Sequence, residues 1–316
     1  MSIMRLSDLS SVERAQRLRR EGLLLRTGPF TFRIHSPIAL VSEGLGLMYA
    51  DNLLADEADF VDFDLHLVPV SGIRRWVMPQ VQFLHDGDSP FQPLPAGHAY
   101  PLLEWSMNWC IASMVHDELL LHAAVIERDG LAAILPAPAG SGKSTLCAGL
   151  TQRGWRLLSD EVAMVSLVNG LVSALARPVS LKNESIEVMR RFAPDAVFNR
   201  VSHGTSKGSV THMRAPVDAV RRADTAACPR WVVFPRFVAG AAPLLKARSR
   251  ADSMLELGRN SFNYMVLGEA GFQTLGDMVA RSDCYDFEYS QLDDAVAVFD
   301  RLVLDARAAG QVSHAD

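Results

Sequence analysis

Residues Leu121 to Glu161 read LHAAVIERDG LAAILPAPAG SGKSTLCAGL TQRGWRLLSD E, and this stretch decides the fold. Leu131 to Leu135 is a short apolar run, which predicts a buried strand. Ser144 to Arg153 has helical composition and is followed by Gly154, a residue common at helix ends. A glycine-rich loop, Ala137 to Ser144, joins the two. The order strand, loop and helix predicts an α/β fold.

The loop fits the Walker A pattern G-x-x-x-x-G-K-[ST], except that Ala137 replaces the first glycine. A helix N-terminus offers unpaired N–H groups and a partial positive charge, and glycines let the backbone wrap around phosphate oxygens. Lys143 can reach the β- and γ-phosphates of ATP or GTP, and the Ser144 hydroxyl can bind Mg²⁺. A chance glycine-rich loop is the alternative. The residues expected to hold the nucleotide are Ala137, Pro138, Ala139, Gly140, Ser141, Gly142, Lys143, Ser144 and Thr145.

An acidic pair, Asp160 and Glu161, follows a second apolar segment at residues 155–158. About 17 residues separate Lys143 from Asp160, which is one crossover, so the two strands should lie close in the sheet. Ligands bind at the carboxyl ends of strands in open α/β sheets. A carboxylate there can hold Mg²⁺ or accept a proton from an attacking hydroxyl. We favour Asp160 as the base and Glu161 as the metal ligand; the reverse assignment, and a surface pair that caps the next segment, stay open.

These motifs resemble the C-terminal catalytic domain of HPr kinase/phosphorylase, a bacterial serine kinase. They are more similar to its shorter relatives, which include kinases of lasso-peptide precursors and exosortase-associated members. The resemblance rests on Leu121-His122-Ala123, on the loop, and on Arg153-Gly154-Trp155-Arg156 before the acidic pair, and it covers about 40 residues. It implies a P-loop core of the HPr-kinase/PEP-carboxykinase type that uses Mg²⁺. It also implies that His122 orients the transferred phosphoryl group or a carboxylate.

The chain departs from the family pattern at three points. Glu161 replaces the second Asp, Ala123 replaces a Gly, and the family's metal-binding Glu-Ile-Arg-Gly segment has no clear counterpart. We therefore expect kinase activity without the reverse phosphorolysis.

The composition is typical of a globular protein. The 316 residues suffice for about two domains, and 49% of them are hydrophobic. A net charge of −5 argues against general nucleic-acid binding, which needs a basic surface. The four cysteines form no C-x-x-C pair, which favours reduced thiols. No signal peptide and no apolar run of about 18 residues is visible, so we expect a cytoplasmic location and no membrane span.

We expect a smaller N-terminal α+β domain at residues 1–98 and a P-loop kinase domain at residues 99–316. Residues 9–20 have a helical pattern with a capping serine, and residues 23–84 alternate like a small, mainly antiparallel sheet. A buried helix is expected from Pro101 to about Val115. Asn169-Gly170 predicts a hairpin turn.

Three basic residues are candidates for substrate contacts. Arg177 and Lys182 lie in a segment near the expected site and could neutralise phosphate charge; a salt bridge or exposed loop charge is the alternative for each. Residues 202–216 are polar, Gly-rich and basic, and resemble in position the mobile loop by which the family docks its protein substrate. Lys207 is the favoured residue there, against an ordinary surface loop.

The leading hypothesis is an ATP- or GTP-dependent kinase that phosphorylates a hydroxyl, usually Ser in this family, on a peptide or small protein. An NTP hydrolase and a nucleotide-dependent peptide adaptor are the alternatives. A homo-oligomer stays open, because one branch of the family forms hexamers. The kinase hypothesis requires Lys143 and Asp160 to open onto one cavity.

Overall fold

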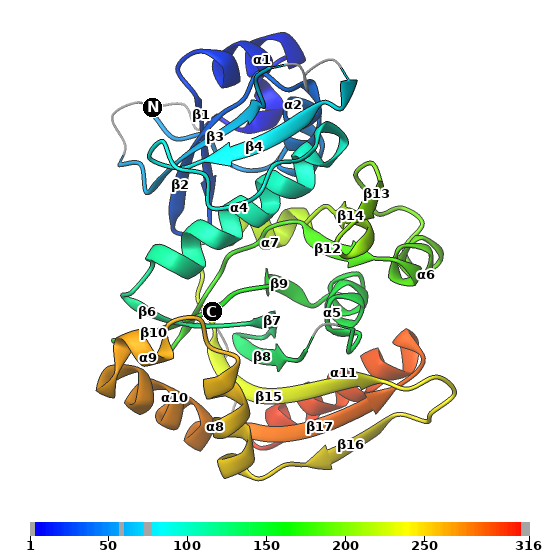
Figure 1. Cartoon of the computed structure of the whole chain (residues 1–316). Helices are drawn as coiled ribbons and strands as arrows, with labels where there is room; N and C mark the ends of the chain where they lie inside the picture. The colour runs from blue at the N-terminus through cyan, green and yellow to red at the C-terminus, as the bar shows by residue number, and fades with distance from the viewer. Residues whose placement is uncertain (1–3, 57–59, 73–76, 139, 311–316) are drawn as a thin grey trace.

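The computed structural model describes residues 4–56, 60–72, 77–138 and 140–310 (Figure 1). Within these ranges the fold is mixed α/β, with one five-stranded sheet, one six-stranded sheet and two three-stranded sheets. Figure 1 shows the five-stranded sheet at one end of the molecule, the six-stranded sheet at the other, and helix α4 between them. No helix in the described ranges has both the length and the apolar character that a membrane crossing requires.

The five-stranded sheet confirms the alternating pattern. Its order is β1-β2-β3-β4-β5, and every pairing is antiparallel except that of β2 with β3. Alternation places Phe32, Ile34 and Leu65 in the core and their neighbours on the outer face. The strands are β1 (Leu23–Thr27), β2 (Phe30–His35), β3 (Phe63–Pro69), β4 (Gln80–Leu84) and β5 (Leu94–Pro95).

Among the described residues, helices α1 and α2 pack against this sheet, and the sequence predicted the first of them. Helix α1 (Ser11–Arg19) follows the 3₁₀ turn η1 (Leu6–Asp8) and is capped by Ser10, whose side chain accepts a hydrogen bond from the Glu13 amide. Helix α2 (Ala39–Met48) was not expected, because glycines at positions 44 and 46 weaken its helical signal. Gly44 has a packing reason: a Cβ there would lie 2.0 Å from Cδ2 of Tyr100.

Helix α4 (Ala99–Met114), preceded by the 3₁₀ turn η2 (Ala96–His98), joins the two main sheets. It begins two residues before the predicted start, and Pro101 still lies in its first turn, where a missing N–H costs no hydrogen bond. Its apolar side chains share one core with the five-stranded sheet and with Leu120, Val162 and Met164.

The six-stranded sheet has the order β16-β17-β15-β8-β7-β9. Strand β7 is antiparallel to both β8 and β9, so β8 and β9 run in the same direction with β7 between them. The strands of the loop and of the acidic pair are therefore close, as predicted, without being neighbours. The bounds are β7 (Ala123–Arg128), β8 (Leu131–Pro136), β9 (Arg156–Ser159), β15 (Cys228–Phe237), β16 (Leu244–Ala247) and β17 (Asp283–Tyr289).

Helices cover both faces of this sheet. Side chains of α5 (Lys143–Thr151) and α11 (Leu292–Ala308) belong to the apolar core on one face. Side chains of α8 (Arg250–Arg259) and α10 (Glu269–Arg281) belong to the core on the other, and the short α9 (Tyr264–Leu267) packs beside it. The sheet is therefore the middle layer of three.

The two small sheets lie next to the ends of β7 and β9. One consists of β6 (Glu118–Leu121), β10 (Ala163–Ser166) and β11 (Val172–Ser173), and its β10–β11 hairpin confirms the predicted turn. The other consists of β12 (Val179–Lys182), β13 (Ser202–Thr205) and β14 (Gly208–Met213), flanked by α6 (Glu184–Phe192) and α7 (Val217–Arg221). Most of the segment expected to be a loop at 202–216 forms the β13–β14 hairpin, because β14 pairs with β12 and residues 210–213 are buried there. A role of this segment in docking a substrate stays a prediction.

Candidate active site

Three chain segments meet at one edge of the six-stranded sheet. Strand β8 ends there and continues into the glycine-rich loop, and β9 ends there before the acidic pair. Strand β7 begins there, since Ala123 pairs with Pro136 and Val125 with Ser159. His122 lies at the break between β6 and β7, where its amide donates to the Asn260 carbonyl at 2.7 Å. Topology alone therefore brings His122, the loop and the acidic pair together.

The loop between β8 and α5 has the backbone that its glycines allow. Gly140 and Gly142 have φ values of 86° and 91°, a conformation that favours glycine. The Tyr289 hydroxyl donates to the Gly142 carbonyl at 2.9 Å, and a Cβ at position 142 would lie 2.5 Å from that hydroxyl oxygen. The amide of Phe237 donates to the Ser141 carbonyl at 2.9 Å. Strands β15 and β17 thus hold the loop from below.

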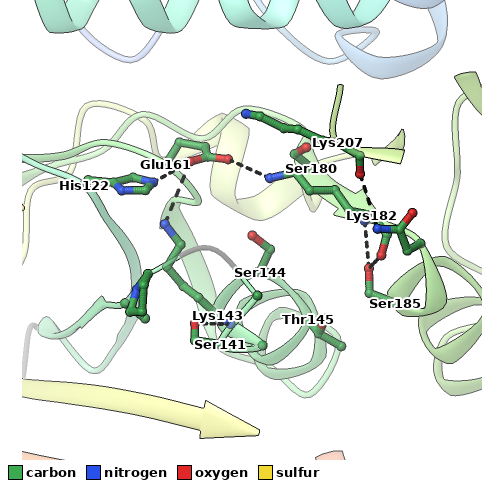
Figure 2. A pocket seen from close by; sticks show the side chains of 15 residues that line it. His122, Ser141, Lys143, Ser144, Thr145, Glu161, Ser180, Lys182, Ser185 and Lys207 are labelled. Carbon is green, nitrogen blue, oxygen red and sulfur yellow. Dashed lines mark hydrogen bonds and ion pairs between the residues drawn. The ribbon is translucent and has the colours of Figure 1, made fainter. Parts of the chain in front are cut away.

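A cavity of about 520 Å³ opens above the loop (Figure 2). It contains every predicted loop residue except Ala139, which lies outside the described residues. It also contains His122, Glu161, Lys182 and Lys207. The full lining is His122, Ala137, Pro138, Gly140, Ser141, Gly142, Lys143, Ser144, Thr145, Glu161, Ser180, Lys182, Asn183, Ser185 and Lys207.

Glu161 is the centre of the charged groups in this cavity. Its Oε2 lies 3.0 Å from His122 Nε2 and 3.9 Å from Lys143 Nζ, and its Oε1 lies 3.8 Å from Lys182 Nζ. Burial by itself would raise the pKa of Glu161. The hydrogen bond from His122 and the two lysine charges outweigh burial, so the pKa lies well below its ordinary value of 4.5. Glu161 is therefore an anion held between cationic groups.

Lys143 is a buried cation that points into the cavity. Its residue is 7% exposed, and among the described residues its Nζ has no hydrogen-bond partner. A buried ammonium group without hydrogen bonds is costly, and an anion delivered to the cavity would relieve that cost.

Asp160 does not open onto this cavity, contrary to the sequence-based expectation that it shares one with Lys143. Its carboxylate lines an adjacent cavity of about 20 Å³, which meets the larger one at Glu161 and Ser180. The Ser180 amide donates to Asp160 Oδ2 at 3.0 Å, while Oδ1 is buried and has no hydrogen-bond partner among the described residues. Of the two carboxylates, only that of Glu161 thus reaches the large cavity, while Asp160 lines the small one.

The environment of Asp160 shifts its pKa in the opposite direction from that of Glu161. Burial, followed by repulsion from Glu161, raises the pKa of Asp160 to about 6. The charge of Lys143, the Ser180 amide and the Ser144 hydroxyl oppose this rise. Asp160 therefore still lies within electrostatic reach of Lys143 and Ser144, although they line different cavities.

Of the three residues predicted to contact substrate, two line the large cavity and one does not. Lys182 and Lys207 line the large cavity, and Lys207 lies over the Trp105 ring with Nζ 5.4 Å from its centroid. Arg177 does not line it. The Arg177 guanidinium is buried against α4, where it donates to Glu104 Oε2 at 2.7 Å and to Asn108 Oδ1 at 2.6 Å.

Part of this chain is similar in sequence to curated proteins. Two curated HPr kinase/phosphorylases, from two strains of Treponema pallidum, are each 28% identical over 159 residues, which is 48% of this chain and 48% of theirs. The matched region is HPr-kinase-like. The chain spans about half the length of the curated relatives it matches, and no family model matches it. The solved Hpr(Ser) kinase/phosphatase of Coxiella burnetii aligns over 62% of this chain and 99% of its own, with 13% identity and a TM-score of 0.28.

Sequence reasoning missed several groups around the candidate site. Ser180, Asn183 and Ser185 line the cavity, and they flank Lys182, so their position next to a predicted basic residue was a usable signal. Phe237 and Tyr289 support the loop from strands about 100 and 150 residues away, and no local pattern marks them.

A second cavity, of about 810 Å³, adjoins the first. The two share Gly140, Gly142, Thr145, Lys182, Asn183 and Ser185. Beyond these shared residues the second cavity has a mixed lining. Val188, Phe192, Phe237, Tyr289 and Leu292 are apolar or aromatic, whereas Arg153, Glu184, Arg191, Ser290, Gln291 and Asp293 are polar or charged. The region over the loop thus continues into a cavity that has aromatic side chains in part of its wall.

Proposed function

We propose that this protein is a nucleoside-triphosphate-dependent kinase that transfers a phosphoryl group to a hydroxyl, Ser in the first instance, on a peptide or small protein. One observation carries the proposal. The Lys143 ammonium is buried without a hydrogen-bond partner in the described ranges, beside a glycine-rich loop and facing the Glu161 carboxylate. A triphosphate would supply the missing hydrogen-bond acceptor, and the Glu161 carboxylate would remain next to the incoming hydroxyl.

In this proposal residues 99–316 form a P-loop domain of the HPr-kinase/PEP-carboxykinase type. Residues 1–98 form a smaller α+β domain that accompanies it, and the protein acts in the cytoplasm. The relationship of the matched region to HPr kinase/phosphorylase supports the kinase domain. The shared core of α4 with both parts supports a fixed arrangement of the two.

In this proposal the nucleotide binds across the two adjoining large cavities, with its phosphates in one and its nucleoside in the other. The phosphates of ATP or GTP bind to the loop from Gly140 to Thr145 and to Lys143, since this cavity is lined by loop backbone and lysines. The nucleoside extends into the second cavity, where Phe237 and Tyr289 offer aromatic surface.

The residues present also fit a magnesium ion. The Ser144 hydroxyl and Asp160, whose buried Oδ1 has no hydrogen-bond partner in the described part of the chain, supply the oxygen ligands that Mg²⁺ prefers. When bound, the ion neutralises charge on the β- and γ-phosphates.

The condition set from the sequence, that Lys143 and Asp160 open onto one cavity, is not met, because Asp160 lines the smaller cavity. The kinase proposal therefore rests on Glu161, which shares the cavity of Lys143, and it exchanges the roles first favoured for the acidic pair. Glu161 opens onto the large cavity and takes the proton of the substrate hydroxyl, while Asp160 stays behind it on the metal side. A low pKa does not exclude Glu161, because proton transfer is a small part of the barrier in a loose phosphoryl-transfer transition state. His122 orients the carboxylate through its 3.0 Å hydrogen bond. Lys182 and Lys207 bind the acceptor or the transferred phosphoryl group.

Transfer of a γ-³²P label tests the proposal. The protein is incubated with labelled ATP or GTP, Mg²⁺ and either HPr or a Ser-containing peptide. Labelled acceptor supports the kinase. Free phosphate alone supports a hydrolase, and nucleotide binding without turnover supports an adaptor, and either result overturns the kinase proposal.

Site variants then test the assigned groups. Lys143→Ala should abolish nucleotide binding or turnover, while Lys246→Ala, at an exposed position on β16, should leave both intact. Glu161→Gln should keep nucleotide binding and lose transfer. Asp160→Asn should weaken the dependence on Mg²⁺. If Glu161→Gln transfers label at the normal rate, the base is not Glu161.

A further inference from the structure

A second group of metal-ligand side chains lies far along the chain from the loop, on the N-terminal sheet. His35 ends β2, and Asp64 and His66 lie on the neighbouring parallel strand β3. The register pairs His35 with His66, and alternation directs all three side chains to the outer face, away from the core. In the part of the chain that the structure describes, this is the group whose histidine and carboxylate ligand atoms all lie within 4.8 Å of one another.

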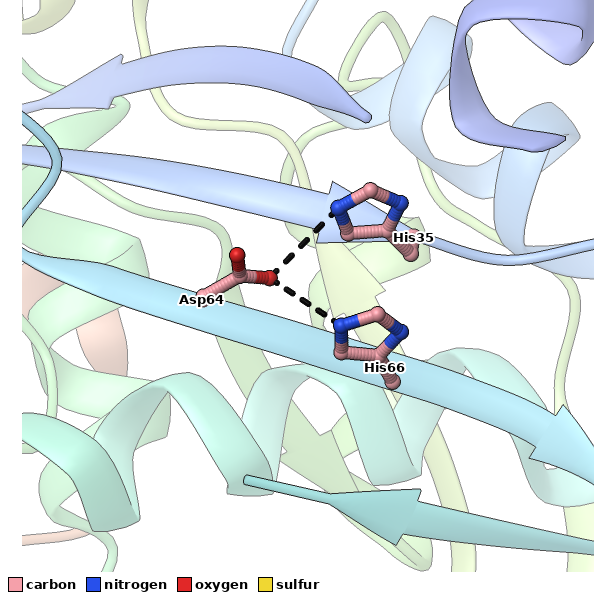
Figure 3. A group of neighbouring side chains, drawn as sticks. All are labelled: His35, Asp64 and His66. Carbon is pink, nitrogen blue, oxygen red and sulfur yellow. Dashed lines mark ion pairs between the residues drawn. The ribbon is translucent and has the colours of Figure 1, made fainter. Parts of the chain in front are cut away.

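The two histidines converge on a single carboxylate oxygen (Figure 3). His35 Nε2 lies 3.5 Å and His66 Nε2 lies 3.3 Å from Asp64 Oδ1. The imidazole rings are stacked, with centroids 4.3 Å apart and planes within 3°. Figure 3 shows both rings presenting a nitrogen to the same side, toward the carboxylate.

These separations are long for hydrogen bonds and fit an ion between the groups. Charge-assisted N–H···O bonds have lengths of about 2.7–2.9 Å. Two ligands at about 2.0–2.1 Å from a tetrahedral Zn²⁺ are about 3.3 Å apart. Consistently, Asp64 Oδ1 is buried and has no hydrogen-bond partner among the described residues. The other oxygen, Oδ2, faces Arg33 at 3.6 Å, which leaves Oδ1 to the histidines.

The surroundings leave room for an ion to enter. The side chains of His35, Asp64 and His66 are 20%, 38% and 44% exposed. Gly22 faces His35, and a Cβ there would lie 2.8 Å from His35 Nε2, so the absent side chain keeps this nitrogen accessible. Because the rings are parallel, a rotation about their Cβ–Cγ bonds is needed to direct both lone pairs at one point.

We propose that His35, Asp64 and His66 form a binding site for a divalent transition-metal ion, Zn²⁺ in the first instance. Imidazole ligands select such ions over Mg²⁺ and Ca²⁺, which prefer all-oxygen sites. Structural zinc sites normally have four protein ligands, whereas this one has three. The fourth position is open to water or to a donor atom from another molecule. The site is independent of the proposed kinase activity.

Zn²⁺ binding to the untagged full-length chain tests this proposal. The protein is treated with a chelator, exchanged into buffer with excess Mg²⁺, and titrated with Zn²⁺ against a chromophoric indicator. One equivalent of Zn²⁺ should bind to the wild type, and His66→Gln and Asp64→Asn should each weaken binding at least about 100-fold. Co²⁺ in place of Zn²⁺ should give visible absorption bands that both variants lose.

Two controls make the result specific. His116→Gln, at an exposed histidine outside the group, should bind like the wild type, and so should Glu161→Gln, which changes the large cavity. Thermal unfolding without metal checks that each variant is folded. Failure of the wild type to bind Zn²⁺, or equal binding by folded His66→Gln and Asp64→Asn, overturns the proposal and leaves a histidine–carboxylate ion-pair cluster.

Discussion

Replacing Asp160 by Asn should stabilise the folded protein above about pH 6, although Asp160 lies at the proposed site. The residue is 5% exposed, and burial with repulsion from Glu161 raises its pKa from 3.8 to about 6. The folded state therefore binds this proton more tightly than the unfolded state does. Between about pH 4 and pH 6 stability falls as the pH rises, and above about pH 6 the loss is complete.

The difference between the two pKa values sets the magnitude. A shift from 3.8 to about 6 corresponds to about 3 kcal/mol at about pH 8 and to roughly half of that at about pH 5. Asparagine removes the charge and keeps an oxygen for the Ser180 amide. The NH₂ group of asparagine replaces Oδ1, which already lacks a hydrogen-bond partner within the described residues. Burying the NH₂ group there should therefore add little to the free-energy cost of the unpaired polar atom.

Urea unfolding of the wild type and Asp160→Asn, in metal-free buffer with a chelator, measures this effect. The variant should gain up to about 3 kcal/mol at about pH 8 and clearly less at about pH 5. A loss of stability at about pH 8, or an equal gain at both pH values, would show that the raised pKa is not the cause.

Three further changes test other parts of the fold. Glu161→Gln should destabilise the folded protein at neutral pH, because the lowered pKa of Glu161 contributes stability above about pH 4.5 that is lost as the pH falls. If the difference in unfolding free energy between variant and wild type grows on acidification, this explanation is wrong. Arg177→Leu should cost about 3–5 kcal/mol in urea unfolding by leaving Glu104 buried and unpaired, and Arg177→Leu/Glu104→Leu should recover part of it. Gly44→Ala should lower the melting temperature, because the new Cβ would lie 2.0 Å from an atom of the Tyr100 ring. Gly46→Ala should lower it less, because the new Cβ would contact the flexible end of Arg14.

Elements with a strong internal period could be predicted from the sequence. Helices α1 and α4 and strand β8 were expected close to their observed bounds, because the pattern that identifies each one lies within its own residues. The elements that were not predicted form because of contacts with other segments of the chain. Gly44 weakens the signal of α2 and is explained by a ring on α4, about 56 residues away. The β13–β14 hairpin has a loop-like composition and owes its order to pairing with β12.

The same distinction applies to the site. His122, the glycine-rich loop and the acidic pair lie on three consecutive segments, so their meeting at one sheet edge follows from a short piece of chain. The contact between Tyr289 and that loop could not be predicted in this way. Tyr289 lies close to Gly142 because of the strand order in the six-stranded sheet, which brings together segments far apart in the sequence. Arg177 had the charge expected of a substrate contact. Its burial follows from Glu104 on α4, a partner that no local pattern connects to it.

The opposite environments of Asp160 and Glu161 are set by groups outside their own segment. Both follow one strand, and the sequence offers no reason to give them different roles. Lys182 comes from β12 and His122 from the start of β7, and both lie on the side that Glu161 faces, so that carboxylate stays charged. The Ser180 amide and the buried small cavity lie on the other side, where Asp160 is held with a raised pKa. Two adjacent carboxylates whose pKa values are pushed apart can divide two tasks, one at the hydroxyl and one at the metal. The surroundings of one strand end are therefore sufficient to shift the pKa values of two adjacent carboxylates in opposite directions.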